Sequence, residues 1–111
     1  MEFPKFIQDM HALDLPFPAE MVKTHCIRSD KGLMVIFDVL QEISLPPHSH
    51  LGQWGTVIEG SIKLTIDGET KTYKPGESYN IPSGVVHSAT IYAGSKVMDI
   101  FEEPDRYPLK G

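Results

Sequence analysis

Short strand-like segments, separated by glycine, proline and Asp-Gly, constrain the fold of this 111-residue chain most strongly. Ser61–Ile66 alternates apolar and polar residues and ends at Asp67-Gly68, a pair typical of tight hairpin turns. The one helix candidate, Lys5–Leu13, is short and lies between two prolines. Repeated short strands in so small a chain favour an all-β barrel or two-sheet jelly roll. We expect eight strands: Val22–Arg28, Leu33–Glu42, Gln53–Glu59, Ser61–Ile66, Thr70–Tyr73, Glu77–Ile81, Val86–Tyr92 and Lys96–Glu102.

The length allows one domain with one hydrophobic core. No linker or low-complexity tract divides the sequence. Within the single domain we expect residues 1–30 to form an N-terminal segment with the first strand. Residues 31–102 form the barrel, and the polar, proline-broken residues 103–111 form a C-terminal tail.

Composition argues against two classes of partner. The formal net charge is −5 and no block of basic residues exists, so nucleic acid is not an expected partner. No apolar run is long enough to cross a bilayer, and the first ten residues lack the apolar stretch of a signal peptide. Cys26 is the sole cysteine, which excludes an intrachain disulfide and fits a reducing compartment. We therefore expect a cytoplasmic protein without membrane partners.

Three histidines and a glutamine form a candidate metal site. The run PPHSHLGQWGTVIEG carries His48, His50 and Gln53, and PGESYNIPSGVVH ends at His87. Residues two apart on a strand face the same way, so His48 and His50 could both reach one ion inside a barrel. Imidazole and amide donors suit a divalent first-row metal, and Fe, Mn, Ni, Co, Cu or Zn could each be accommodated.

These residues also resemble the two sequence motifs of the cupins, small β-barrels of the jelly-roll class. Gly76, Pro82, Gly84 and His87 match the second motif in full. His48, His50 and Gly60 match the first motif, and Gln53 stands where glutamate is usual. The resemblance covers about Leu33 to Phe101 and implies a single-domain double-stranded β-helix, a metal held by the histidines, and a small-molecule ligand or substrate.

Gln53 departs from the motif in two ways. A neutral amide leaves a divalent ion its full charge, which favours Lewis-acid chemistry over redox chemistry. The spacing from His50 to Gln53 is also shorter than the family's. On a continuous strand this odd offset would turn Gln53 to the opposite face, so Gln53 can be a ligand only if the chain turns at Leu51-Gly52.

A narrower resemblance concerns the last strand. Cupins that ketonise unsaturated uronates carry an Asp-x-Phe near the end of the barrel and an arginine shortly after. Asp99 and Phe101 match that pattern, and Arg106 is displaced by one position. This resemblance implies an acid/base role for Asp99. Tyr79 is a second candidate for moving a proton beside the metal.

Three functions remain open at this stage. The first is a metal-dependent lyase or isomerase acting on a small polar carbonyl compound or sugar acid. The second is a metal-dependent dioxygenase, and the third is a non-catalytic module that binds a metal or small molecule. The fold does not separate them, because cupins host many activities, and whether the protein is an enzyme at all stays open.

Trp54 suggests a subunit contact. If Gln53 faces the barrel interior, the next residue along the strand faces outward. A tryptophan on an outer sheet face is either covered by the second sheet or buried in a subunit contact, and we favour the contact. Since small cupins are often homodimers, the resemblance implies a homodimer here.

Overall fold

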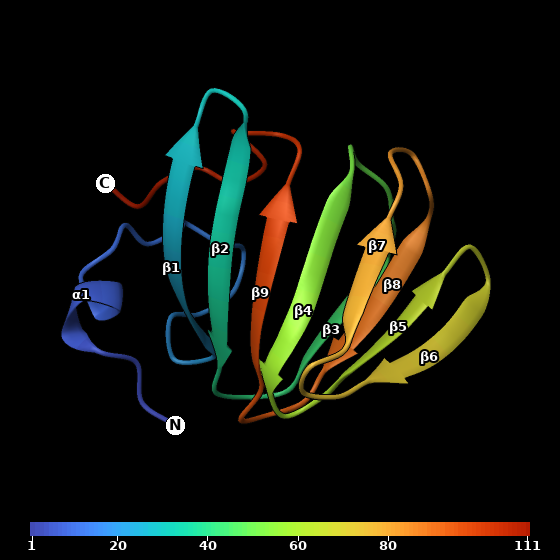
Figure 1. Cartoon of the computed structure of the whole chain (residues 1–111), viewed down its shortest axis with the longest axis horizontal. Helices are drawn as coiled ribbons and strands as arrows, with labels where there is room; N and C mark the ends of the chain where they lie inside the picture. The colour runs from blue at the N-terminus through green and yellow to red at the C-terminus, as the bar shows by residue number, and fades with distance from the viewer.

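A computed structural model describes all residues, 1–111, and contains two antiparallel sheets (Figure 1). The five-stranded sheet has the order β1-β2-β9-β4-β7 and the four-stranded sheet the order β3-β8-β5-β6. The predicted all-β jelly roll is confirmed. The strands are β1 (Val22–Ser29), β2 (Gly32–Val39), β3 (Ile43–His48), β4 (Gln53–Glu59), β5 (Ile62–Ile66), β6 (Glu69–Tyr73), β7 (Ser78–Ile81), β8 (His87–Ile91) and β9 (Lys96–Phe101).

The strand β3 is absent from the eight expected from the sequence. It contains Pro46 and Pro47, which cannot donate to a ladder and usually argue against a strand. The structure resolves the conflict by placing β3 at the edge of its sheet, where β8 is its only neighbour. A register irregularity between Leu45 and His48 marks the proline pair. The edge position therefore permits a strand where the sequence pattern excluded one.

The N-terminal helix α1 (Lys5–Gln8) is much shorter than the predicted Lys5–Leu13. None of its residues is buried, so no packing extends it beyond one turn. It is also the only helix, and it is far too short to cross a membrane.

The hairpin between β5 and β6 is built as the sequence predicts. Asp67 and Gly68 have φ angles of 50° and 82°, so both central residues adopt the left-handed conformation of a type I′ turn. Asp67 is the only non-glycine residue with positive φ in the protein. The turn fixes the register of β5 on β6, and hence which face of β5 points inward.

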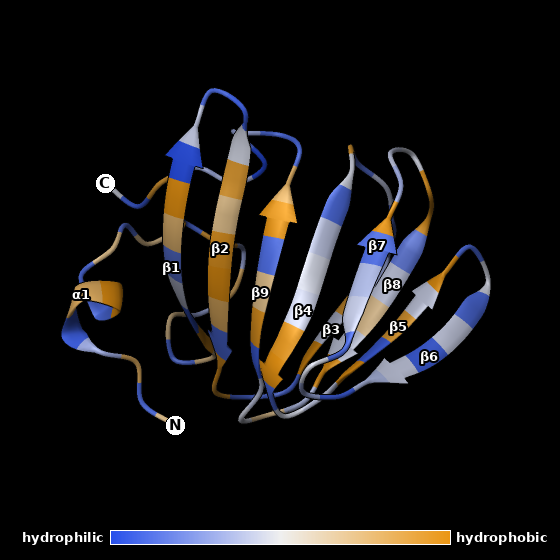
Figure 2. Cartoon of the chain, viewed as in Figure 1, coloured by the Kyte–Doolittle hydropathy of each residue, from blue (hydrophilic) through white to orange (hydrophobic).

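The core lies between the two sheets. Its larger cluster contains eleven buried residues, among them Val57, Ile62 and Val97. A smaller cluster around Leu33 and Val35 lies toward β1 and β2. Figure 2 shows a long apolar stretch on β2 and shorter apolar stretches on β1 and β9. These strands form one wall of the barrel, and their packing holds β9 in place beside β4.

The two terminal segments pack together beside β1 (Figure 1). Leu13 forms a bridge with Leu109, and His11 forms one with Cys26 of β1. The guanidinium of Arg28 donates to the carbonyl oxygen of Tyr107 over 2.7 Å. The C-terminal residues thus act as a strap that closes the barrel near the end of β9.

Candidate metal centre

The three motif histidines meet at one end of the barrel. His48 ends β3 and pairs in register with His87, the first residue of β8. His50 lies in the connection to β4, beyond the end of β3. The prediction that His48 and His50 share one face of a strand is therefore wrong. The Nε2 atoms of His50 and His87 are 3.1 Å apart, and one nitrogen from each of the three histidines lies within 4.8 Å of the others.

Backbone carbonyls orient all three imidazoles. Nδ1 of His48 lies 2.8 Å from the Pro46 oxygen, and Nδ1 of His87 lies 2.9 Å from the Val85 oxygen. Nδ1 of His50 lies 2.7 Å from the Leu51 oxygen. A carbonyl can only accept, so each Nδ1 carries a proton, and in the neutral imidazole each Nε2 then presents a lone pair. This arrangement is the usual support of metal-binding histidines.

The geometry fits a divalent transition metal. Two imidazole nitrogens about 2.1 Å from one ion, at tetrahedral or octahedral angles, are about 3.0–3.4 Å apart. The Nε2 atoms of His50 and His87 are within that range. Two lone pairs so close repel each other unless a proton or cation lies between them. Burial lowers the pKa of both His50 and His87, which keeps them neutral and able to bind metal.

Gln53 lines the same cavity as the histidines. The chain bends at Leu51 and passes from the four-stranded to the five-stranded sheet before β4 begins at Gln53. The turn that the short spacing requires is therefore present. The side-chain nitrogen of Gln53 donates to Oδ1 of Asp99 over 3.0 Å. This bond leaves the amide oxygen as the atom with which Gln53 could bind a metal.

Asp99 and Tyr79 form a buried acid–phenol pair. The Tyr79 hydroxyl donates to Oδ1 of Asp99 over 2.6 Å, so this oxygen accepts two hydrogen bonds and Oδ2 accepts none from the protein. Burial raises the pKa of Asp99 to about 6, against the lowering effect of the two donors. Burial, together with the Asp99 charge, raises the pKa of Tyr79 well above its usual value. The carboxyl group therefore titrates near neutral pH, and the phenol stays protonated.

Gly55 makes this pair possible, and sequence reasoning did not assign it that role. It is opposite Asp99 on one side and Tyr79 on the other. A Cβ on Gly55 would overlap the Asp99 carboxylate and the Tyr79 phenol. A glycine at an inward-facing position of a strand was the only available signal.

The Cupin domain family model matches residues 33–101 of the chain. The chain belongs to the cupin family. A search of curated proteins finds no match.

Solved cupin structures share the fold at low sequence identity. KdgF from a Halomonas species is 22% identical, with 85% of this chain and 86% of that chain covered and a TM-score of 0.71. An RmlC-like cupin from Shewanella frigidimarina is 23% identical, with coverages of 89% and 87% and a TM-score of 0.74. Bacillus subtilis oxalate decarboxylase, a protein with Mn(II) centres, is 19% identical with a TM-score of 0.69. That match covers 89% of this chain but only 29% of the decarboxylase chain.

Two further residues of this cupin's C-terminal region lie near the histidines. The Phe101 ring is edge-on to His50, with 5.9 Å between ring centroids. The Arg106 guanidinium lies 4.5 Å from the centre of the Tyr107 ring, and Tyr107 lines the same cavity as the histidines. Nε of Arg106 is buried without a hydrogen-bond partner. The residues of the narrower uronate-cupin pattern thus lie at the histidine end of the barrel.

Proposed function

We propose that this cupin is a metal-dependent lyase or isomerase acting on a small polar carbonyl compound or sugar acid. The observation that carries the proposal is the convergence of three imidazoles at a cavity that is also lined by one buried carboxylate, Asp99. We assign His48, His50, His87 and the amide oxygen of Gln53 as metal ligands. When bound, a divalent metal with these neutral ligands would supply Lewis acidity.

Asp99 is proposed to exchange the proton. General catalysis is most efficient when the pKa of the group lies near the working pH, and the pKa of Asp99, about 6, meets that condition. The hydrogen bonds from Tyr79 and Gln53 hold Oδ1, so Oδ2 is the oxygen available to a ligand. Tyr79 acts as a positioning residue in this account, because its proton is committed to Asp99.

Exchange of substrate protons with solvent tests this function. We expect metal-loaded protein in D₂O to replace the α-proton of at least one compound in a panel of 2-oxo acids, hydroxyketones and unsaturated uronates, measured by proton NMR. The Asp99→Asn variant should lose this exchange by about 10²–10⁴-fold. The control Asp30→Asn removes a carboxylate exposed in the β1–β2 turn and should exchange normally.

Two results would contradict the proposal. One is O₂ consumption with any member of the panel, which would favour a dioxygenase. The other is metal-loaded protein that exchanges no proton of any compound, which would favour a non-catalytic binding module.

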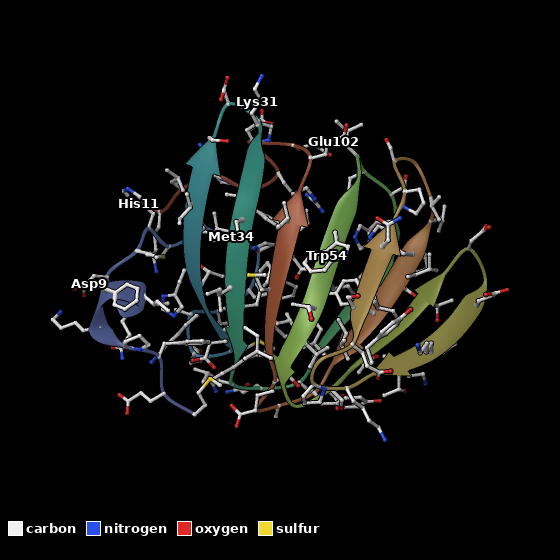
Figure 3. All side chains as sticks on the ribbon, viewed as in Figure 1. Asp9, His11, Lys31, Met34, Trp54 and Glu102 are labelled. Carbon is white, nitrogen blue, oxygen red and sulfur yellow. The ribbon has the colours of Figure 1, made fainter.

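We also propose that the protein forms a homodimer through the outer face of the five-stranded sheet. Four neighbouring residues in register across β1, β2, β9 and β4, here termed the apolar row, face outward: Ile27, Met34, Ile100 and Trp54. Trp54 is 40% exposed and Ile27 49% exposed. Figure 3 shows Met34 and Trp54 on this face. Solvent-facing apolar side chains grouped in this way commonly mark an interface.

A second copy suits the apolar row because the row can pair with itself. A two-fold axis parallel to the strands, between β2 and β9, would place Trp54 on Ile27 of the second copy and Met34 on Ile100. The outer face of the four-stranded sheet differs, since Ser44, Thr90 and Lys63 are neighbours in register there. That polar face is suited to solvent.

The substitution Trp54→Glu is expected to convert the dimer to a monomer, because it would bury two charges at the contact. Sedimentation should give twice 12.4 kDa for the wild type and 12.4 kDa for the variant. Thr72→Glu, on the outer face of β6, is the matched control and should stay dimeric. A wild-type mass of 12.4 kDa at high protein concentration would refute the dimer.

A further inference from the structure

The barrel interior beneath the histidines is layered, and each layer has its own chemistry. On the four-stranded sheet, the register places His48 beside His87, then Leu45 and Leu64 on either side of Ala89, then Ile43 and Ile62 on either side of Ile91. Successive inward-facing residues of β8 thus lead from the histidines to a wholly apolar floor. Asp99 and Tyr79 belong to the opposite sheet, on either side of Gly55.

A cavity of about 60 Å³ lies in this interior, lined at one end by the histidines, Gln53 and Asp99 and otherwise mostly by apolar side chains. Ala89 is the smallest side chain in the row Leu45–Ala89–Leu64, so the wall recedes directly below His87. The volume exceeds the roughly 30 Å³ share of one water and is well below the roughly 150 Å³ cavity that holds benzene. The space therefore fits an apolar group of a few carbon atoms.

We infer that the ligand of this site is a short-chain aliphatic oxo acid whose oxygen atoms face the histidines and whose alkyl chain lies against Leu45, Ala89 and Leu64. This inference rests on the proposed function and narrows its substrate class. The alkyl chain meets no polar partner on the four-stranded sheet. Asp99, on the other wall, is buried and is the only carboxylate that lines the cavity.

The same lining disfavours a polyhydroxylated acid. A hydroxyl placed against Leu64 or Ile91 loses its bonds to water and gains none, which weakens binding by roughly tenfold or more for each group. Each methylene buried there strengthens binding about fourfold instead. Chain length and hydroxylation therefore have opposite effects on affinity.

A homologous series of ligands tests the inference. Calorimetry on Co²⁺-loaded protein should give a Kd that falls about fourfold per methylene from pyruvate through 2-oxobutanoate to 2-oxopentanoate, with D-galacturonate weaker than all three. In Ala89→Val the pyruvate affinity should persist and the gain from the longer chains should disappear. Thr90→Val, which faces outward on the same strand, is the matched control. A Kd that does not change with chain length, or tighter binding of galacturonate, would overturn the inference.

Xenon binding separates this inference from the proposed metal chemistry, because it needs no metal. Dry apolar cavities bind xenon. Crystals of chelator-treated protein under xenon pressure should show one xenon atom next to Ala89, and crystals of Ala89→Val should show none. Absence of xenon in the wild type would overturn the inference even if Co²⁺ binds. Failure of Co²⁺ to bind, with xenon present, would instead refute the proposed function and leave the apolar ligand site supported.

Discussion

Replacing His87 with alanine is expected to lower the affinity for Zn²⁺ or Co²⁺ by more than a hundredfold. His87 is buried, pairs in register with His48, and places its Nε2 atom 3.1 Å from that of His50. Loss of a residue that merely supports a ligand costs 10–100-fold in metal affinity, and loss of the ligand itself should cost more. Isothermal calorimetry of both proteins measures the difference.

The same substitution should remove most of the stabilisation that metal gives. At a free metal concentration of a hundred times Kd, binding adds about 2.7 kcal/mol to the free energy of unfolding. For a domain of this size that corresponds to a rise in Tm of roughly 10–20 °C between chelator and metal. His87→Ala should show almost no rise, and His11→Ala, at an exposed histidine, should show the full rise. Equal rises in wild type and His87→Ala would mean that the ion binds elsewhere.

Replacing Asp99 with asparagine is expected to stabilise the metal-free protein at neutral pH. The pKa of Asp99 is about 6 in the folded protein, against 3.8 for an unperturbed aspartate. Between these pH values the folded protein keeps a proton that the unfolded chain has released. The free energy of unfolding therefore falls as pH rises from about 4 to 6. This difference in pKa of about two corresponds to roughly 3 kcal/mol.

Asparagine cannot ionise, so the variant should not show this fall. Urea unfolding in the presence of chelator should give Asp99→Asn and wild type similar stabilities at pH 4. At pH 7.5 the variant should be more stable by up to about 3 kcal/mol. Asp30→Asn, at an exposed carboxylate, should follow the wild type at both pH values. Parallel pH profiles for Asp99→Asn and wild type would show that the Asp99 carboxyl is not held at a raised pKa.

Stability and proposed activity conflict at Asp99. Burying the carboxylate destabilises the fold at neutral pH, and the same burial brings its pKa into the range useful for proton transfer. A side chain that serves only the fold would not need to be ionisable there. The pair of measurements on Asp99→Asn, higher stability with lost proton exchange, would therefore distinguish a functional carboxylate from a structural one.

Local patterns predicted most of the strands, because alternation and turn residues are properties of neighbouring positions. The Asp67-Gly68 hairpin and the bounds of β4 illustrate this success. Strand β3 was not predicted, because a proline pair is tolerated in a strand only at the edge of a sheet. Which strand lies at an edge depends on the topology of the whole fold. The predicted helix was too long, because the helix buries none of its residues and no packing extends it.

The sequence predicted which residues form the site, but not the hydrogen bonds that orient them. Spacing identified His48, His50 and His87, and the structure brings them together. Their orientation depends on carbonyl oxygens from local turns, such as that of Val85, which sequence spacing does not reveal. The Gln53–Asp99 bond joins residues 46 positions apart and follows from the register of β9 on β4. Long-range register of this kind is set by packing of the whole barrel.

The central claim is that the three histidines bind one divalent metal ion, and anomalous diffraction from crystals grown with Co²⁺ tests it most directly. We predict one anomalous peak per chain, about 2.0–2.2 Å from Nε2 of His48, His50 and His87. The Nδ1 atoms should keep their bonds to the backbone carbonyls. No peak at this position at saturating Co²⁺, or a peak away from these three nitrogens, would contradict the account.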